Sequence, residues 1–231
     1  MAVITISKEL GSGGIDIAHQ VAQRLGYDYV DKHTTDAIFR QYGLTKFNEL
    51  YSSAPSFLDI LNADNLLLVS MANEITEAVA KRGNVVIQGR AGFAVLADYA
   101  DVLHVRIQAP LAARIRQLTA QEHIASPEAA EERLRDDDHV HKMYVQRFYN
   151  KQWDAPENFA LVIDTRAVPF DAAVAQIVAE AQALAQAAPG TNALTTASVA
   201  VDPVLASAVD DVMANPPFMP QTPQIANARL Q

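Results

Sequence analysis

The sequence predicts an α/β protein in which a five-stranded parallel sheet is covered by helices on both faces. Three observations indicate this fold. Short apolar runs that suit buried strands alternate along the chain with longer segments of helical period. A glycine-rich turn joins the first apolar run to the first helical segment. Half of the 231 residues are hydrophobic, which is enough for one sizeable core.

The first predicted strand, residues 3–6, ends in the glycine-rich loop Gly11–Gly14. In the segment that follows, the apolar residues recur with helical spacing, and we expect one face to hold Ile15, Ala18, Ala22 and Leu25. Glycines let backbone N–H groups converge, and the start of a helix adds partial positive charge. The loop therefore predicts a phosphate site, with an ordinary glycine turn as the alternative.

This loop departs from the standard phosphate-binding pattern G-x-x-x-x-G-K-[ST]. If Gly13 is the last glycine of the pattern, Gly14 stands at the lysine position and Ile15 at the position of the hydroxyl that binds Mg²⁺. Lys8 then stands at the first glycine, which places a cation on the entry side of the loop. Lys8 is either a phosphate ligand or a solvated lysine at a strand end.

The remaining elements follow from apolar runs, glycine stops and capping residues. Further strands are predicted at 27–30, 85–87, 102–107 and 160–163. Helices are predicted at 32–41, from Asn62 or Asp64 to 81, at 93–96, from Pro110, from Ser126 to about 148, and from Pro169 to near 187. The long helix ending at 81 should bury Leu67, Met71, Ile75, Ala78 and Val79, and residues 44–61 should be irregular or in short helices.

Three loops should meet at one edge of the sheet. Gly11–Gly14, Asp31 and Gly89–Arg90 each follow the carboxyl end of a predicted strand, where open α/β sheets bind ligands. Asp31 is either a substrate contact or only the cap of the helix that follows it. Arg40, at the end of that helix, is either a phosphate contact or a cap for its carbonyl groups.

Composition excludes several classes of protein. The net charge of −9 argues against a general nucleic-acid binder, and no apolar run approaches the length of a membrane span. The chain has no cysteine and starts directly with a strand, so we expect a cytoplasmic protein. The acidic and histidine-rich run 136–141 is read as a solvated helix face rather than a metal site, and Arg106, inside a strand, should pair with an acid.

The segment 189–231 differs from the rest, because it holds six of the eleven prolines and few charges. We expect a flexible Pro/Ala-rich tail here. The alternative is a short helix starting at Asp202-Pro203, with Leu205, Val209 and Val212 or Met213 on one side.

Several stretches together resemble the cytidylate kinase-like branch of the P-loop nucleoside monophosphate kinases. They are ITISKELGSGG at 4–14, YVDK at 29–32, VIQGRA at 86–91, VLHVRIQAP at 102–110, RFY at 147–149 with Trp153, and FALVIDT at 159–165. The resemblance spans about residues 3–186. It implies a P-loop NTPase-like three-layer sandwich over residues 1–188, with a helical lid at about 126–155.

The resemblance also implies an activity: transfer of the γ-phosphoryl group of ATP, with Mg²⁺, to a nucleoside monophosphate, with CMP or dCMP as the first guess. The donor phosphates would be wrapped by Gly11, Ser12, Gly13, Gly14 and Ile15. The acceptor would be held by Asp31, Arg40 and Arg90, and the catalytic cations would be Lys8, Arg90, Lys142 and Arg147.

Departures from the family pattern leave a second interpretation open. Gln88 and Ala91 stand where the family carries acids beside Gly-Arg, and His141 stands where its lid carries arginine. The chain is then either a kinase or a nucleotide-binding regulatory module that has lost activity. In that second case a protein partner could bind through the C-terminal segment.

Overall fold

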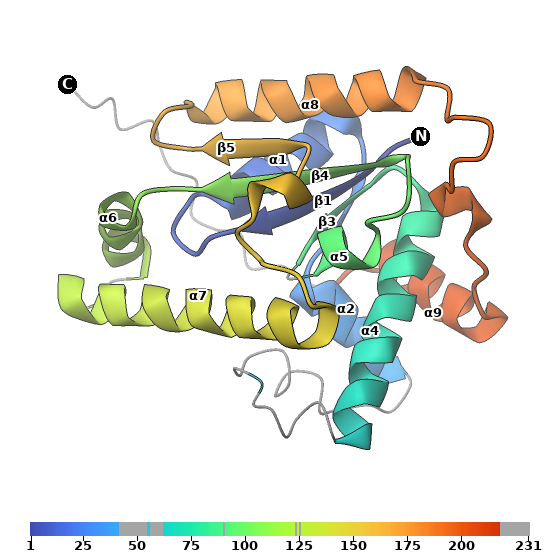
Figure 1. Ribbon diagram of the computed structural model, residues 1–231, viewed down its shortest axis with the longest axis horizontal. Coiled ribbons are helices and arrows are strands. Elements are labelled where there is room, and N and C mark those ends of the chain that lie inside the picture. Colours follow the sequence, from blue (N-terminus) through green and yellow to red (C-terminus); the bar gives the residue numbers. More distant parts are fainter. Residues whose placement is uncertain (42–54, 56–61, 90, 123, 125, 218–231) are drawn as a thin grey trace.

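The sheet of this protein contains five parallel strands, as the sequence predicts. The computed structural model describes residues 1–41, 55, 62–89, 91–122, 124 and 126–217 (Figure 1). The strands are β1 (Val3–Lys8), β2 (Asp28–Val30), β3 (Val85–Gln88), β4 (Val102–Gln108) and β5 (Leu161–Asp164), in the order β2-β3-β1-β4-β5. All four pairings are parallel, so the carboxyl ends of the strands lie along one edge.

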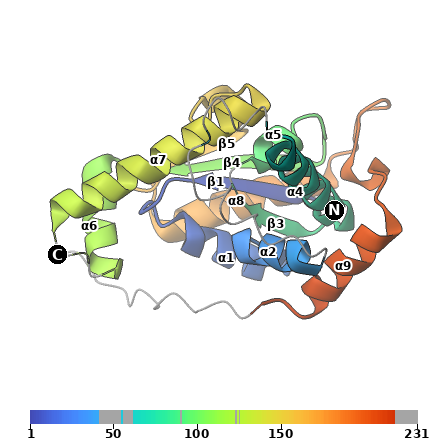
Figure 2. The ribbon, with the colours of Figure 1, turned by 90° about the horizontal axis from the view of Figure 1, so that it is seen from below.

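Helices cover both faces of the sheet, which confirms the three-layer arrangement. The helices are α1 (Gly14–Leu25), α2 (Lys32–Gln41), α4 (Ala63–Arg82), α5 (Gly92–Val95), α6 (Leu111–Glu122), α7 (Pro127–Tyr149), α8 (Phe170–Gln186) and α9 (Pro203–Ala214), with 3₁₀ turns η2 (Pro156–Asn158) and η3 (Thr196–Ser198). Buried residues of α1 and α8 form one apolar cluster with strand residues such as Ile4 and Val105. On the other face, α2, α4, α5, α7 and α9 contribute to a second cluster (Figures 1 and 2).

The predicted capping residues begin and end several of these helices. Asn62, rather than Asp64, caps α4, because its side chain accepts a hydrogen bond from the N–H of Asp64. Ser126 caps α7 in the same way and is followed by Pro127 at the first helical position. Gly26 ends α1 in the left-handed conformation, with φ 65°.

Two predicted helix faces are shifted from the expected position. In α1 the buried side chains are Ile17, Ala18, Val21 and Ala22, while Ile15 is only half-buried. In α4, Leu67 is 55% exposed, and its neighbour Leu68 is buried instead. A row of apolar residues three and four apart fits two overlapping stripes on a helix, and packing against the sheet selects one of them.

The C-terminal segment corrects the expectation of a flexible tail that begins at residue 189. Residues 203–214 form α9, whose buried side chains join the same cluster as α2 and α4. The residues before α9 are hydrogen-bonded to the domain: the N–H and hydroxyl of Thr196 donate to the carboxylate of Asp101 at 2.8 and 2.7 Å. The alternative of a helix at Asp202-Pro203 is therefore correct. The predicted irregular segment 44–61 lies almost entirely outside the described residues, as do residues 218–231.

No helix in the described part of the chain is long and apolar enough to cross a membrane. Among the described residues, no group of three His, Asp or Glu side chains is arranged to hold a metal ion.

Candidate active site

The glycine loop closes tightly between β1 and α1, and two of its glycines adopt conformations that other residues rarely take. Gly11 and Gly13 have φ of 75° and 76°. A Cβ at Gly11 would also lie 2.9 Å from the carbonyl oxygen of Arg114, so the loop passes close to the start of α6. Gly13 caps α1 without a side-chain hydrogen bond. The first N–H groups of α1 have no intrahelical partner and carry its positive dipole end, as an anion site requires.

Lys8 lies directly against the position where the standard loop carries its lysine. A Cβ built on Gly14 would be 2.6 Å from the Cβ of Lys8 and 3.3 Å from its Cγ. The stem of Lys8 thus occupies the space that a side chain at Gly14 would need. The absence of a side chain at Gly14 therefore leaves room for Lys8, which lies at the carboxyl end of β1.

The hydroxyl of Ser12 is used inside the loop. Ser12 Oγ donates to the carbonyl oxygen of Glu9 at 2.7 Å, and Ser12 is 3% exposed. Its own carbonyl oxygen accepts from Thr165 Oγ1, just after β5, at 2.9 Å. Ser12 therefore holds the loop closed, and Ile15 can offer a ligand its main-chain N–H but no hydroxyl.

A buried charge network, which sequence reasoning found only in part, fixes the entry to this loop. The Glu9 carboxylate accepts from Arg106 Nη2 at 2.9 Å and from the N–H of Ala109 at 3.1 Å. Arg114 Nη1 lies 3.6 Å from the same carboxylate, and Arg114 Nε donates to the carbonyl oxygen of Leu10 at 2.7 Å. Arg114 also makes a two-pronged contact with Asp138 of α7, both distances being 2.8 Å.

Arg106 confirms the prediction that it pairs with an acid, but its burial was not foreseen. Its side chain is 1% exposed and its guanidinium stacks on Trp153, 4.4 Å from the ring centre. Arg106 Nη1 donates to the carbonyl oxygen of Trp153 at 3.1 Å. Burial lowers the pKa of Arg106, and the charge of Glu9 opposes this shift. Because side chains alternate along a strand, residues 104, 106 and 108 of β4 share one face. This alternation is the sequence signal that could have indicated the position of Arg106.

A small cavity lies between α2, α4, α5 and α7. A cavity of about 50 Å³ is lined there by ten residues, namely Thr35, Ala72, Asn73, Thr76, Ile87, Ala91, Gly92, Val95, Tyr144 and Tyr149. Tyr149 Oη donates to Asn73 Oδ1 at 2.7 Å, which ties the end of α7 to α4 across this cavity. The lining combines apolar walls with hydroxyl and amide groups, as small-molecule pockets do. Of these residues, only Ile87, Ala91 and Tyr149 belong to stretches that the sequence analysis singled out.

The predicted acceptor residues of α2 are found in structural contacts. Asp31 Oδ1 accepts from the N–H groups of His33 and Thr34 at 2.8 and 3.0 Å, so Asp31 caps α2, while its contact with a substrate stays a prediction. Arg40 is exposed and its Nε donates to Asp36 Oδ2 at 2.8 Å. Arg90 lies outside the described residues, although Gly89 before it is at the carboxyl end of β3.

The cations of α7 lie at its exposed side. Lys142 Nζ is 2.9 Å from Asp154 Oδ2, and this hydrogen bond lowers the pKa of Asp154. Arg147 is exposed, and among the described contacts none joins Lys142 or Arg147 to the glycine loop. His141, at the position of the expected arginine, stacks on Trp153 with ring centres 4.8 Å apart. Its Nδ1 lies 2.8 Å from the carbonyl oxygen of Asp137.

These features define a class of protein: an α/β protein with a phosphate-type glycine loop at the carboxyl edge of its sheet. The chain belongs to the cytidylate kinase-like family, whose model matches residues 3–167. It is 31% identical to a cytidylate kinase of Ignicoccus hospitalis over 183 residues, which are 77% of this chain and 97% of that protein. A cytidylate kinase of Pyrobaculum islandicum is 27% identical over 177 residues, with 75% and 89% covered.

Solved structures show the same fold. An uncharacterized protein from Eubacterium ventriosum superposes with a TM-score of 0.57 at 18% identity, covering 79% of this chain and 99% of that one. Shikimate kinase from Bacteroides thetaiotaomicron has a TM-score of 0.50 at 14% identity, covering 78% and 98%. The family and its named relatives together support a nucleotide kinase, that is, a phosphotransferase.

Proposed function

We propose that this protein transfers the γ-phosphoryl group of ATP to a nucleoside monophosphate, with CMP or dCMP as the first substrates to test. The observation that carries the proposal is the contact between Lys8 and Gly14. It supplies a cation beside a loop that otherwise lacks the standard lysine. Enzymes of this kind act mainly by positioning the phosphates and neutralising their charge.

On the donor side, the loop Gly11–Gly14 and the first N–H groups of α1, including that of Ile15, would hold the ATP phosphates. Lys8 would extend along the loop toward the same oxygens. Mg²⁺ would supply charge neutralisation at the ATP phosphates. Magnesium commonly uses one or two carboxylates together with substrate phosphates and waters.

On the acceptor side, the cavity between α2, α4 and α7 would receive the base, and Arg40 and Arg90 would bind the phosphate. Thr35, Asn73 and Thr76 offer hydroxyl and amide groups for the edge of a base. A cavity of about 50 Å³ holds a few water molecules at most. Acceptor binding therefore requires α7 to move away from α4, which breaks the hydrogen bond between Tyr149 and Asn73.

Residues 126–155 would act as the lid, with α7 as its main element. Closing a lid excludes water, which protects ATP from hydrolysis. Lys142 and Arg147 would reach the transferring group only after a rearrangement, because Lys142 is held by Asp154. His141 cannot replace the two-pronged contact that an arginine makes with phosphate oxygens.

A second candidate is a nucleotide-binding module with little or no turnover. The isoleucine at position 15 favours it, because the loop then has no hydroxyl at the position that binds Mg²⁺ in the standard pattern. In this case the loop would bind ATP, and a partner protein would recognise the ATP-bound form. Either candidate would act in the cytoplasm.

A coupled assay of ADP release separates the two candidates. It should be run with ATP, Mg²⁺ and each of CMP, dCMP, UMP, AMP and GMP, alongside calorimetric titrations of ATP and of each monophosphate. Turnover with one or two monophosphates supports the kinase. Binding of ATP without binding of any monophosphate supports the module and refutes the kinase.

A further inference from the structure

We propose that α9 is a brace that holds α2 in the position that acceptor binding needs. The inference rests on the proposed function, because it concerns the acceptor side of the same site. It assigns a positioning role to a segment that lies beyond residues 3–167, the part matched by the family model. The packing of α9 against α2, in one shared apolar cluster, carries it.

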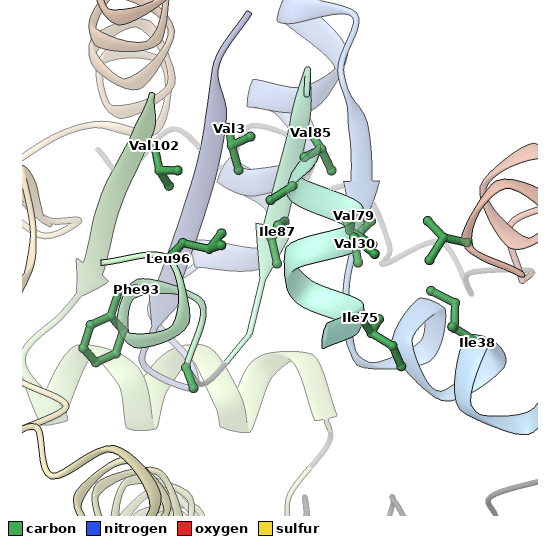
Figure 3. Packing of buried hydrophobic residues seen from close by; sticks show 14 of the residues in the cluster. Val3, Val30, Ile38, Ile75, Val79, Val85, Ile87, Phe93, Leu96 and Val102 are labelled. Atoms are coloured by element: carbon green, nitrogen blue, oxygen red, sulfur yellow. The ribbon is translucent and has the colours of Figure 1, made fainter. Parts of the chain in front are cut away.

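Helix α2 contributes both to the lining of the cavity and to the core. Its start is capped by Asp31 at the carboxyl end of β2, and Thr35 lines the cavity. Ile38 and Phe39, one turn further along the helix, are completely buried. They belong to the cluster that also contains Leu205, Val209 and Val212 of α9. In Figure 3 the side chains of Val30, Ile38 and Ile75 lie close together, and the ribbon of α9 lies beside Ile38.

This part of the fold needs support from outside the sheet. β2 is an edge strand of three residues, and α2 has only ten residues. A helix that short is marginal by itself and depends on tertiary packing of its apolar face. α9 packs on both α2 and α4 and so supplies that packing (Figure 1).

Polar contacts fix the segment that carries α9 to the rest of the domain. The Thr196 contacts with Asp101 hold it at the start of β4. Lys81 Nζ donates to the carbonyl oxygen of Val199 at 2.7 Å, and Arg82 pairs with Asp210 of α9. These contacts lie at the start of β4 and at the end of α4, away from the glycine loop. Displacing α9 should therefore affect the acceptor side and leave the donor side intact.

Two valines of α9 give a matched pair of variants. Val209 is 1% exposed within the shared cluster, whereas Val204 in the first turn is 66% exposed. Val209→Asp places an unpaired carboxylate among apolar groups, which is strongly unfavourable and should displace α9. Val204→Asp makes the same chemical change in solvent. Val209→Ile keeps the apolar contact and should behave as wild type.

The experiment uses the full chain and three measurements: hydrogen exchange of α2, calorimetric affinity for ATP, and affinity and KM for CMP. For Val209→Asp we expect exchange protection of residues 32–41 to fall, and the Kd and KM for CMP to rise by roughly tenfold or more. The Kd for ATP should stay within about twofold of that of Val204→Asp. If Val209→Asp does not fold, Val209→Ala should produce the same changes in α2 protection and CMP affinity, with smaller magnitudes.

Several outcomes would overturn the brace. One is unchanged protection of α2 in Val209→Asp. Another is lost protection with CMP affinity equal to that of Val204→Asp, and a third is an equal loss of ATP and CMP binding, which would mean general destabilisation. If wild type binds ATP but no monophosphate, the proposed function fails, and the exchange of α2 alone then decides whether α9 holds that helix.

Discussion

Replacing Glu9 by glutamine should destabilise the protein far more than the same change at a surface ion pair. Glu9 accepts from Arg106, whose side chain is 1% exposed, and from the N–H of Ala109. Glutamine has one acceptor oxygen and one NH₂ group, so at least one of these donors would face another donor. The guanidinium of Arg106 would also lose its closest counter-charge.

The magnitude follows from the burial of the pair. Removing one partner of a buried ion pair costs about 3 kcal/mol or more, since the other charge stays buried without compensation. For a chain of this size that loss lowers Tm by about 6–12 °C. The matched control is Glu131→Gln, whose partner Arg135 is largely exposed. That change should cost no more than about 0.5 kcal/mol, as for other helix surface pairs.

Urea unfolding followed by circular dichroism measures both free energies of unfolding. The double variant Glu9→Gln/Arg106→Met should lose less than the sum of its two single variants, because removing both charges leaves none buried and unpaired. Equal stability of Glu9→Gln and Glu131→Gln would refute the reasoning. ATP affinity should also fall in Glu9→Gln, because the Glu9 side chain holds the start of the glycine loop against Arg106 and Arg114.

Three further predictions concern pH and the loop. Burial lowers the pKa of His104 in the folded protein to about 4. In the unfolded chain this histidine has its usual pKa of about 6.5, so between pH 7 and pH 5 the unfolded chain binds more protons than the folded protein. The free energy of unfolding should therefore fall by about 2 kcal/mol from pH 7 to pH 5. Urea titrations at both pH values should show a smaller loss in His104→Gln; an equal loss would assign the effect elsewhere. Lys8→Ala should reduce kcat by a factor of about 10² or more, as for other groups that stabilise a transition state, with Tm nearly unchanged; unchanged kinetics would remove Lys8 from the site. Gly14→Ala should weaken ATP binding, measured by calorimetry, because its Cβ would meet that of Lys8; wild-type affinity would contradict the contact.

The order and type of the elements could be predicted because local signals for them are strong. Buried parallel strands are short apolar runs, and Asn62, Ser126 and Gly26 are residues that cap or stop helices for known physical reasons. The position of the glycine loop at the carboxyl edge follows from these elements. The resemblance to a known family then indicated the activity, because the spacing of residues alone does not indicate which reaction a site catalyses.

The α9 brace could not be predicted from local signals. Its apolar residues occupy one face of a twelve-residue helix, and such a helix is marginal in isolation. The proline content of the segment therefore favoured a flexible tail. It is ordered by tertiary packing against α2 and α4 and by hydrogen bonds to the carboxylate of Asp101. Neither is visible until the fold is known.

The Glu9 network was missed for a related reason. Arg106 and Arg114 lie about a hundred residues from Glu9 along the chain, and only the pairing of β1 with β4 brings them together. A charged residue in a strand indicates a partner but does not identify it. Likewise, Asn73 and Tyr149 are separated along the chain by β3, α5, β4 and α6, so their contact across the cavity depends on how α7 packs against α4.

The two sides of the candidate site differ in how they are held, and this difference indicates where motion occurs. The donor loop is fixed by charge-assisted and buried hydrogen bonds among Glu9, Arg106 and Arg114, which open at a high free-energy cost. Across the cavity proposed for the acceptor, α7 and α4 are joined by the Tyr149–Asn73 hydrogen bond and by apolar contacts that also involve α2. Binding sites that open draw on regions of low local stability. We therefore expect ATP to meet a preformed loop, whereas a monophosphate must shift α7 while α2 stays in place against α9.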